Sequence, residues 1–553
     1  MDEKTLELAE EKPDKDKGWK VAQGCIKEGL LYLCVFLTTF LLFIFVKPFT
    51  GYYQYGAFAK AVIAFTLAGC GVFIAYMVAT KRLKARHVAI IILVAGYALR
   101  VGYMLHTPAA TRQHDTYSKN FNGHEAYAWT LFETGELPAK NDYQFYHPPL
   151  NAMLQAAFMR FMDGFSSMFS GSWFPDAYAY GKPSYVDNQR YFLYSTCQIL
   201  SVLYSFVTAV TLMKILKLFH FNDKTYLFLS AFVVLYPRHI QFAGMLNNDA
   251  VAYMLSVLAL YFALKWWKDG KSLVYILLCG LAVGLGMMAK LSSATICLPI
   301  AGIFIYEFIR TLCKKDKALP LWKMVVQYGV FLCVCAPIGL WFQVYASMRF
   351  DQPLGFVFSN LNKKLYTGDH SLWGRFGIAF DLSEYFSSLY CVPFEGNYNL
   401  FHYALRSSIF GEFTYTQGTA WGAVSVLFAY LGVAFLVIGA IWCVVLWWKN
   451  RKDENGFLRQ NPPTNHQDVL FVLLLVASQV LSETYFYVKM PYGCTMDFRY
   501  IMPLILGLAL SVGVVRKVLL ASGRETAVKF CTIFDIVVGA FLISSVLFYT
   551  VCI

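Results

Sequence analysis

The chain has few charged residues and none of the phosphate-binding loops of nucleotide enzymes. Charged side chains make up 15% of its 553 residues, whereas soluble proteins carry about 25%. No Gly-rich loop precedes a helix, and Gly280, Gly284 and Gly286 fall inside an apolar run, where small residues favour helix packing. These absences argue against a soluble nucleotide-dependent enzyme.

A cleavable signal peptide and a metal-ligand spacing of cysteines are also missing. The first residues are highly charged, and the first apolar run is long enough to span a membrane. Most cysteines lie in apolar runs, where small buried residues are expected. Cys391 and Cys494 fall in predicted outer loops, and the sequence leaves open whether they form a disulfide or stay reduced.

Hydrophobic residues, at 58%, dominate what is present. Runs of roughly 20 apolar residues, the length that crosses a bilayer, recur along almost the whole chain. They predict an all-α polytopic membrane protein with about 13 transmembrane helices. The predicted spans are residues 28–47, 57–80, 87–105, 189–213, 225–237, 250–267, 272–290, 292–310, 324–347, 416–446, 468–488, 499–516 and 531–552.

Basic residues are concentrated in one set of alternate loops. By the positive-inside rule this set is cytoplasmic, as is the N-terminus. The formal net charge of +13 therefore reflects membrane topology, and no nucleic-acid partner is predicted. The basic loops are residues 81–86, 214–224, 268–271, 314–317, 449–459 and 516–529.

The opposite loops are rich in aromatic and polar residues, and two are far longer than a connection requires, which is typical of functional loops. The predicted organisation places a charged tail first, then two N-terminal spans, a catalytic transmembrane module, and a final loop and span. These parts are residues 1–27, 28–86, 87–516 and 517–553, with outer loops at 106–188, 238–249, 348–417 and 489–498.

The first outer loop is predicted to contain two helices at the membrane interface. Asn122 can cap the first, Glu125 suits a capping box, and Gly135 stops it. Residues 153–165 form a second, amphipathic stretch that suits the membrane surface.

Two acids at outer ends of spans are the candidate catalytic residues. Asp115, about ten residues beyond a span, can act as a general base or can be a solvated loop acid. Asp249 opens a span from outside, and it can be a functional acid or can stabilise the helix N-terminus.

Four basic residues are the candidates for binding a phosphate or donor. Arg499 opens a span, where a guanidinium suits a lipid phosphate, although snorkelling or pairing with a nearby acid would also explain it. Arg238 faces the same side, and Lys290 lies at an outer boundary between two spans. His147 precedes two prolines that fix the backbone.

The order of these motifs resembles the GT-C-fold transferases related to protein O-mannosyltransferases and to the lipid A aminoarabinose transferase (glycosyltransferase family 39-like). The resemblance covers roughly residues 87–510, although many relatives carry two adjacent acids where this chain has His114-Asp115. The matching elements are the Asp115 loop with Pro148-Pro149-Leu150, Asn247-Asn248-Asp249-Ala250, residues 286–292 and Asp497-Phe498-Arg499-Tyr500.

The resemblance implies a glycosyltransferase with an undecaprenyl-phosphate or other polyprenyl-phosphate sugar donor. Asp115 would be the base, Asp249 would orient the sugar or a basic partner, and Arg499 would stabilise the leaving phosphate, with inversion at the sugar. The acceptor would be a cell-envelope glycan, glycolipid or protein at the extracytoplasmic face of a bacterial plasma membrane.

No obligatory cofactor is expected. His114, His124 and His147 with Asp115 are irregularly spaced for a metal site, so no metal ligand is assigned, and a divalent ion stays an open alternative. Three other functions remain in competition with the transferase: a polysaccharide ligase or polymerase with a diphosphate-linked donor, a secondary transporter and a membrane scaffold. A transporter would be expected to show internal repeats, and none is clear.

Overall fold

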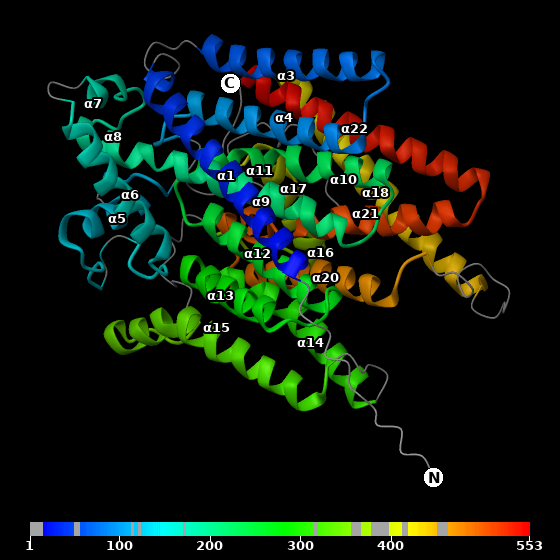
Figure 1. Ribbon diagram of the computed structural model, residues 1–553. Coiled ribbons are helices and arrows are strands. Elements are labelled where there is room, and N and C mark those ends of the chain that lie inside the picture. Colours follow the sequence, from blue (N-terminus) through cyan, green and yellow to red (C-terminus); the bar gives the residue numbers. More distant parts are fainter. Residues whose placement is uncertain are drawn as a thin grey trace.

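The architecture is all-α in a computed structural model of the chain (Figure 1). Within the described part, the only β pairing is an isolated bridge between Tyr366 and Tyr492. Eleven of the described helical segments are long and apolar enough to cross a membrane, which confirms the predicted polytopic fold class. The structure describes residues 15–48, 56–111, 115–119, 123–140, 142, 144–169, 173–313, 319–355, 366–377, 398–411, 419–450 and 463–552.

Each long segment is a single helix or two helices that follow one another directly. They are α1 (Lys15–Phe45), α3 (Gly56–Ala79), α4 (Ala85–His106), α8 (Asn188–Thr196) with α9 (Gln198–Lys217), α12 (Asp249–Lys268), η2 (Leu291–Ile296) with α14 (Cys297–Leu312), α15 (Leu321–Phe350), α18 (Thr419–Asn450), α20 (His466–Lys489), α21 (Leu504–Ala521) and α22 (Glu525–Cys552).

Two of the thirteen predicted spans are shorter helices. The run at 225–237 forms α10 (Asp223–Leu235), with 13 residues, and the run at 272–290 forms α13 (Leu273–Ala289), with 17 residues. Both are shorter than the roughly 20 residues of a straight span. Tyr236 ends α10 because the residue before Pro237 is driven into an extended conformation.

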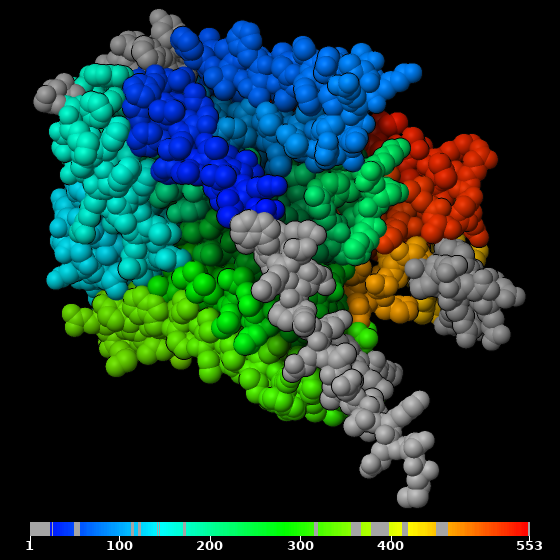
Figure 2. All heavy atoms as spheres, in the orientation of Figure 1, coloured from blue at the N-terminus to red at the C-terminus, as the bar shows by residue number. Residues whose placement is uncertain are grey.

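The helices divide into an inner set and a peripheral set. In the most apolar stretch of α12, 72% of residues are buried, compared with 6% in α3. Helix α3 packs on α4 at the edge of the molecule (Figures 1 and 2), and its side chains Phe65 and Val72 are exposed. Inner helices α4, α9, α12 and α21 therefore form the frame on which the polar residues are held.

The first long loop folds into short helices at one end of the molecule (cyan in Figures 1 and 2). These are α5 (His124–Thr134), α6 (Leu150–Ser167) and α7 (Phe174–Ala177), which precede α8. Both predicted helices are present, and Gly135 ends the first with φ +73°. The predicted capping box is wrong for Glu125, whose carboxylate pairs with Arg190; Asn122 lies outside the described residues.

The N-terminal helix α1 packs against this loop and is hydrogen-bonded to it. Tyr178 donates a hydrogen bond to the carbonyl of Ile44 (2.9 Å). The Lys47 ammonium, just beyond α1, bonds the Thr107 carbonyl (3.0 Å) and the Gln198 side chain (2.7 Å). Because Thr107 ends α4 and leads into the Asp115 segment, α1 helps to fix the entry to that segment.

Short elements connect the remaining helices at the same end. They are α11 (Pro237–Gln241), η1 (Phe242–Gly244), α16 (Leu372–Phe376), α17 (Leu400–Phe410), η5 (Gly493–Met496) and η6 (Phe498–Ile501). Several pack against one another, including α11 with α17 and α17 with η6.

Candidate active site

Four charged side chains from distant parts of the chain form one network. The Arg499 guanidinium lies between two carboxylates, with Nη1 3.6 Å from Asp115 Oδ2 and Nε 3.9 Å from Asp249 Oδ2. The Lys290 ammonium pairs with the other oxygen of Asp249. Two acids and two bases therefore meet, and their formal charges cancel.

The Asp115 segment is held by the start of α5. The backbone amide of His124 donates to the Asp115 carbonyl (2.9 Å), and that of Glu125 donates to the Thr116 carbonyl (3.0 Å). These bonds satisfy amides that a helix N-terminus leaves without partners. Gly123 permits the close approach, since a Cβ there would lie 2.3 Å from the Thr116 carbonyl oxygen.

Asp249 and Lys290 are brought together by a helix start and a helix end. Asp249 is the first residue of α12, and Lys290 adopts an extended conformation between α13 and η2. The Asn248 side chain donates to the carbonyl of Ala289 (3.1 Å), which ties the two ends together. The break that shortens α13 therefore also places the ammonium.

Arg499 is positioned by the short turn η6 and by a buried ion pair beneath it. The Asp497 carboxylate accepts the Arg499 backbone amide (2.8 Å) and caps the turn. Nη2 of Arg238 donates to both oxygens of that carboxylate, at 2.8 and 3.1 Å. Both partners are essentially buried, so this pair fixes η6 from inside the protein.

Exposure differs sharply within the network. The Asp115 side chain is 32% exposed, whereas that of Asp249 is 3% exposed. Arg499 and Lys290 are also largely buried. Asp115 is therefore the member of the network that is most accessible from outside the protein.

Neighbouring charges control the protonation of the loop groups. Burial alone would raise the pKa of the Asp115 carboxyl, but Arg499 and His124 outweigh it and hold that pKa well below its usual range. His124 Nε2 lies 3.4 Å from Asp115 Oδ2, and the His124 ring stacks on His147 at 5.1 Å. Burial, together with His124 and Lys290, keeps the pKa of His147 well below normal.

Two cavities adjoin η6 and differ in size and chemistry. The smaller measures about 20 Å³, enough for about one water molecule. Asp249, Lys290, Arg499 and Tyr500 are among its lining residues. The Tyr500 ring lies 4.4 Å from the Lys290 ammonium and 5.3 Å from the Arg499 guanidinium, so an aromatic face completes the cationic side.

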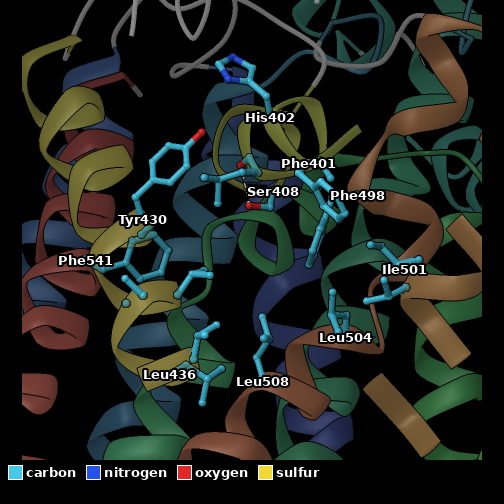
Figure 3. A pocket seen from close by; sticks show the side chains of 18 of the residues that line it. Phe401, His402, Ser408, Tyr430, Leu436, Phe498, Ile501, Leu504, Leu508 and Phe541 are labelled. Carbon is cyan, nitrogen blue, oxygen red and sulfur yellow. Dashed lines mark hydrogen bonds between the residues drawn. The ribbon is translucent and has the colours of Figure 1, made fainter. Parts of the chain in front are cut away.

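The larger cavity measures about 670 Å³ and is walled mainly by hydrocarbon (Figure 3). Its walls come from α10, α17, α18, α20, α21 and α22. Among the described lining residues, Glu483 is the one acid. Phe498 and Ile501 of η6 face this cavity, whereas Arg499 and Tyr500 face the small one. Residues i and i+3 eclipse in a 3₁₀ turn, which explains the division.

The structure brings together most of the predicted site residues. Asp115, Asp249, Lys290 and Arg499 form the network itself. His147 adjoins it through the His124 ring. Arg238 contributes indirectly, since it bonds Gln241 and Asp497, and Asp497 in turn accepts the Arg499 backbone amide.

Three residues of the site escaped the sequence reasoning. From the sequence, His124 suggests only an unassigned metal alternative, and Tyr500 only a motif residue beside Arg499. Glu483, which is 2% exposed, has a carboxyl oxygen without a hydrogen-bond partner among the described residues. An ionisable residue inside an apolar span is itself a signal of function, and this signal would have identified Glu483.

Some sequence predictions concern residues outside the described ranges. His114 and Cys391 belong to this group, so the open alternative of a metal site that includes His114 and the open question of a Cys391–Cys494 disulfide both concern residues outside the described ranges. Over the described residues, no group of three or more His, Cys, Asp or Glu side chains is arranged to hold a metal ion.

A family comparison covers one segment of the chain and bears on the class of protein. Residues 195–341 match the family described as dolichyl-phosphate-mannose-protein mannosyltransferase, which confirms the resemblance inferred from the sequence. With the polytopic helical fold, this match supports a membrane glycosyltransferase of the GT-C type. No curated protein matches the chain. Asp249 and Lys290 lie inside the matched segment, whereas Asp115 and Arg499 join it only through folding.

Proposed function

We propose that this protein transfers a sugar from a polyprenyl-phosphate donor to an acceptor hydroxyl at the extracytoplasmic membrane face, with inversion. The main support for the proposal is the position of η6 between the charged network and the apolar cavity. One side of this turn presents Arg499 to the charged network, and the other presents Phe498 and Ile501 to the apolar cavity. A lipid phosphate has the same two parts, an anionic head and a hydrocarbon tail.

The two cations are suited to the head of the donor. Arg499 offers a planar guanidinium that matches phosphate oxygens, and Lys290 adds a second charge beside it. Charge grows on the phosphate as the bond to the sugar breaks, so donors placed there stabilise the transition state. The lipid tail would enter the apolar cavity, whose walls come from six helices.

Asp115 is the base in this proposal. Its carboxylate is the most exposed of the network, so an acceptor hydroxyl can approach it. The hydroxyl oxygen forms a bond to the anomeric carbon while its proton passes to Asp115. The bond between that carbon and the phosphate oxygen breaks, and its electron pair leaves with the phosphate. Attack opposite the leaving group inverts the anomeric centre.

Sugar transfer by purified protein tests this function. The protein would be offered radiolabelled undecaprenyl-phosphate sugars and, separately, undecaprenyl-diphosphate-linked sugars, with cell-envelope extract as acceptor, in the wild-type form and as Asp115→Asn. Asp163→Asn is the matched control, because it removes one acid from the same loop and can still accept the bond from Gln189. We expect labelled product from wild type and Asp163→Asn, and loss of at least about 100-fold in Asp115→Asn.

Other outcomes would contradict the proposal at different points. Full activity in Asp115→Asn would show that another group is the base. Turnover only with diphosphate-linked donors would identify the protein as a ligase or polymerase. No turnover of any donor by folded protein would contradict the transferase function.

A further inference from the structure

The acids and bases of the charged network neutralise one another, although the proposed function requires the network to bind another anion. Its two carboxylates already neutralise Arg499 and Lys290, and the adjoining cavity has room for about one water molecule. A phosphate added to this arrangement would face two acids at close range. Binding therefore requires that a cation exchange one of its present partners.

Arg499 is the cation best placed to exchange partners. Its separations of 3.6 Å from Asp115 and 3.9 Å from Asp249 exceed normal hydrogen-bond lengths. Lys290, in contrast, makes a close pair with the nearly buried Asp249. Moving Asp115 away from Arg499 costs less than separating the buried pair, since Asp115 can be solvated.

The same contact makes Asp115 a poor base while the donor is absent. Arg499 and His124 hold the pKa of its carboxyl well below the usual range, against the effect of burial. A carboxylate that is so strongly stabilised in its charged form has little tendency to take a proton from a hydroxyl. A phosphate that pairs with Arg499 neutralises the guanidinium, which is the largest of the effects that lower this pKa.

We propose, on the basis of the proposed function, that donor phosphate and the Asp115 carboxylate compete for the Arg499 guanidinium, so that donor binding releases Asp115 to act as the base. The donor enters as a phosphodiester monoanion and leaves as a phosphomonoester. Asp115 gains the hydroxyl proton and later gives it to water. The exchange makes catalysis ordered, with the donor bound before the acceptor is activated, and it limits premature reaction with water.

Equilibrium binding of an unreactive donor mimic tests the competition directly. The probe is the radiolabelled methyl diester of undecaprenyl phosphate, which carries the donor's single negative charge but no sugar. We expect Asp115→Asn to bind it about 10-fold more tightly than wild type, because the competing carboxylate is gone. Asp115→Glu keeps the charge and should bind with wild-type affinity.

Two further variants separate partner exchange from a general loss of negative charge. Asp163→Asn removes another acid of the same loop and should leave the affinity unchanged. Glu483→Gln removes an acid that interacts electrostatically with Arg499 and also lines the cavity proposed for the lipid tail, so its affinity is compared with that of Asp115→Asn and is not assumed to stay unchanged. A gain in Glu483→Gln equal to that in Asp115→Asn would overturn the competition, since a general change of field would then explain both.

The kinetics provide an independent measurement. In Asp115→Asn the donor KM should fall while kcat also falls, whereas loss of a simple donor contact would raise KM. Unchanged or weaker probe binding by a folded Asp115→Asn protein would overturn the inference. If wild type still transfers sugar in that case, the proposed function stands; if wild type neither binds the probe nor transfers sugar, both fail.

Discussion

The two cavities beside η6 show how one short turn can separate two kinds of environment. The charged cavity is about 20 Å³ and the apolar one about 670 Å³. They share no lining residue, yet both use side chains of the four-residue η6. The small cavity is built from chain breaks and helix ends, and the large one from the faces of continuous helices.

This difference has a physical cause. Charged groups in a membrane protein need partners, and helix termini provide polar backbone groups together with a favourable dipole. Asp249 stands at such a terminus, and Lys290 stands at a break. Hydrocarbon walls need no such partners, so side chains along regular helices can form them. The proposed function requires that η6 keep the charged cavity and the apolar cavity on its two sides.

The ion pair beneath η6 should be the most sensitive point of this arrangement. Arg238→Ala leaves the Asp497 carboxylate buried and without the guanidinium nitrogen that donates to both of its oxygens. We expect the free energy of unfolding to fall by about 3–5 kcal/mol. We also expect loss of sugar transfer, because η6 would lose its fixed position between the two cavities. Thermal unfolding and activity in detergent would measure the two effects.

A double variant makes that prediction sharper. Arg238→Met with Asp497→Leu replaces the pair by apolar side chains and should recover much of the stability. Equal stability of wild type and Arg238→Ala would show that the pair does not anchor the turn.

On the charged side, Lys290→Met should lower kcat by about 100-fold, because one positive charge at the leaving phosphate is lost. Lys290→Arg keeps that charge and should retain more activity than Lys290→Met. Single-turnover transfer rates would show the difference. Similar rates in the two variants would mean that shape rather than charge matters at this position.

On the apolar side, Leu508→Trp should narrow the large cavity and raise the KM for a long-chain donor by about 10-fold. A donor with a short lipid should be affected less, since it fills less of the cavity. Leu481→Trp is the matched control, because Leu481 lies on α20 with its side chain 67% exposed. An equal rise in KM for the long-chain and the short-chain donor would show that the large cavity does not bind the lipid tail.

The smallest expected effect concerns His147 and pH. Its pKa is lowered in the folded protein by burial and by His124 and Lys290. The unfolded chain therefore binds more protons, and this residue's contribution to stability is lost as pH falls below about 6.5. His147→Gln should remove at most about 1.4 kcal/mol per pH unit of that loss. Parallel curves of melting temperature against pH for wild type and variant would contradict this.

Much of the fold follows from local sequence. Apolar runs predicted the long helices, and eleven of the thirteen predicted spans correspond to helices of sufficient length. Gly135 was correctly predicted to end α5, because a left-handed residue there favours glycine. The run at 225–237 is short in the sequence itself, and Lys290 was correctly predicted to lie between two spans, since the structure has it between α13 and η2.

The sequence by itself determined the helical membrane architecture and the types of residue available at the ends of spans. Both depend on local composition, which sets helix length and the cost of a charge in lipid. Only the tertiary structure decided that Arg499 lies between Asp115 and Asp249 and that Arg238 instead anchors η6. Residues separated by hundreds of positions meet through packing, and the charge balance of a site exists only after they have met.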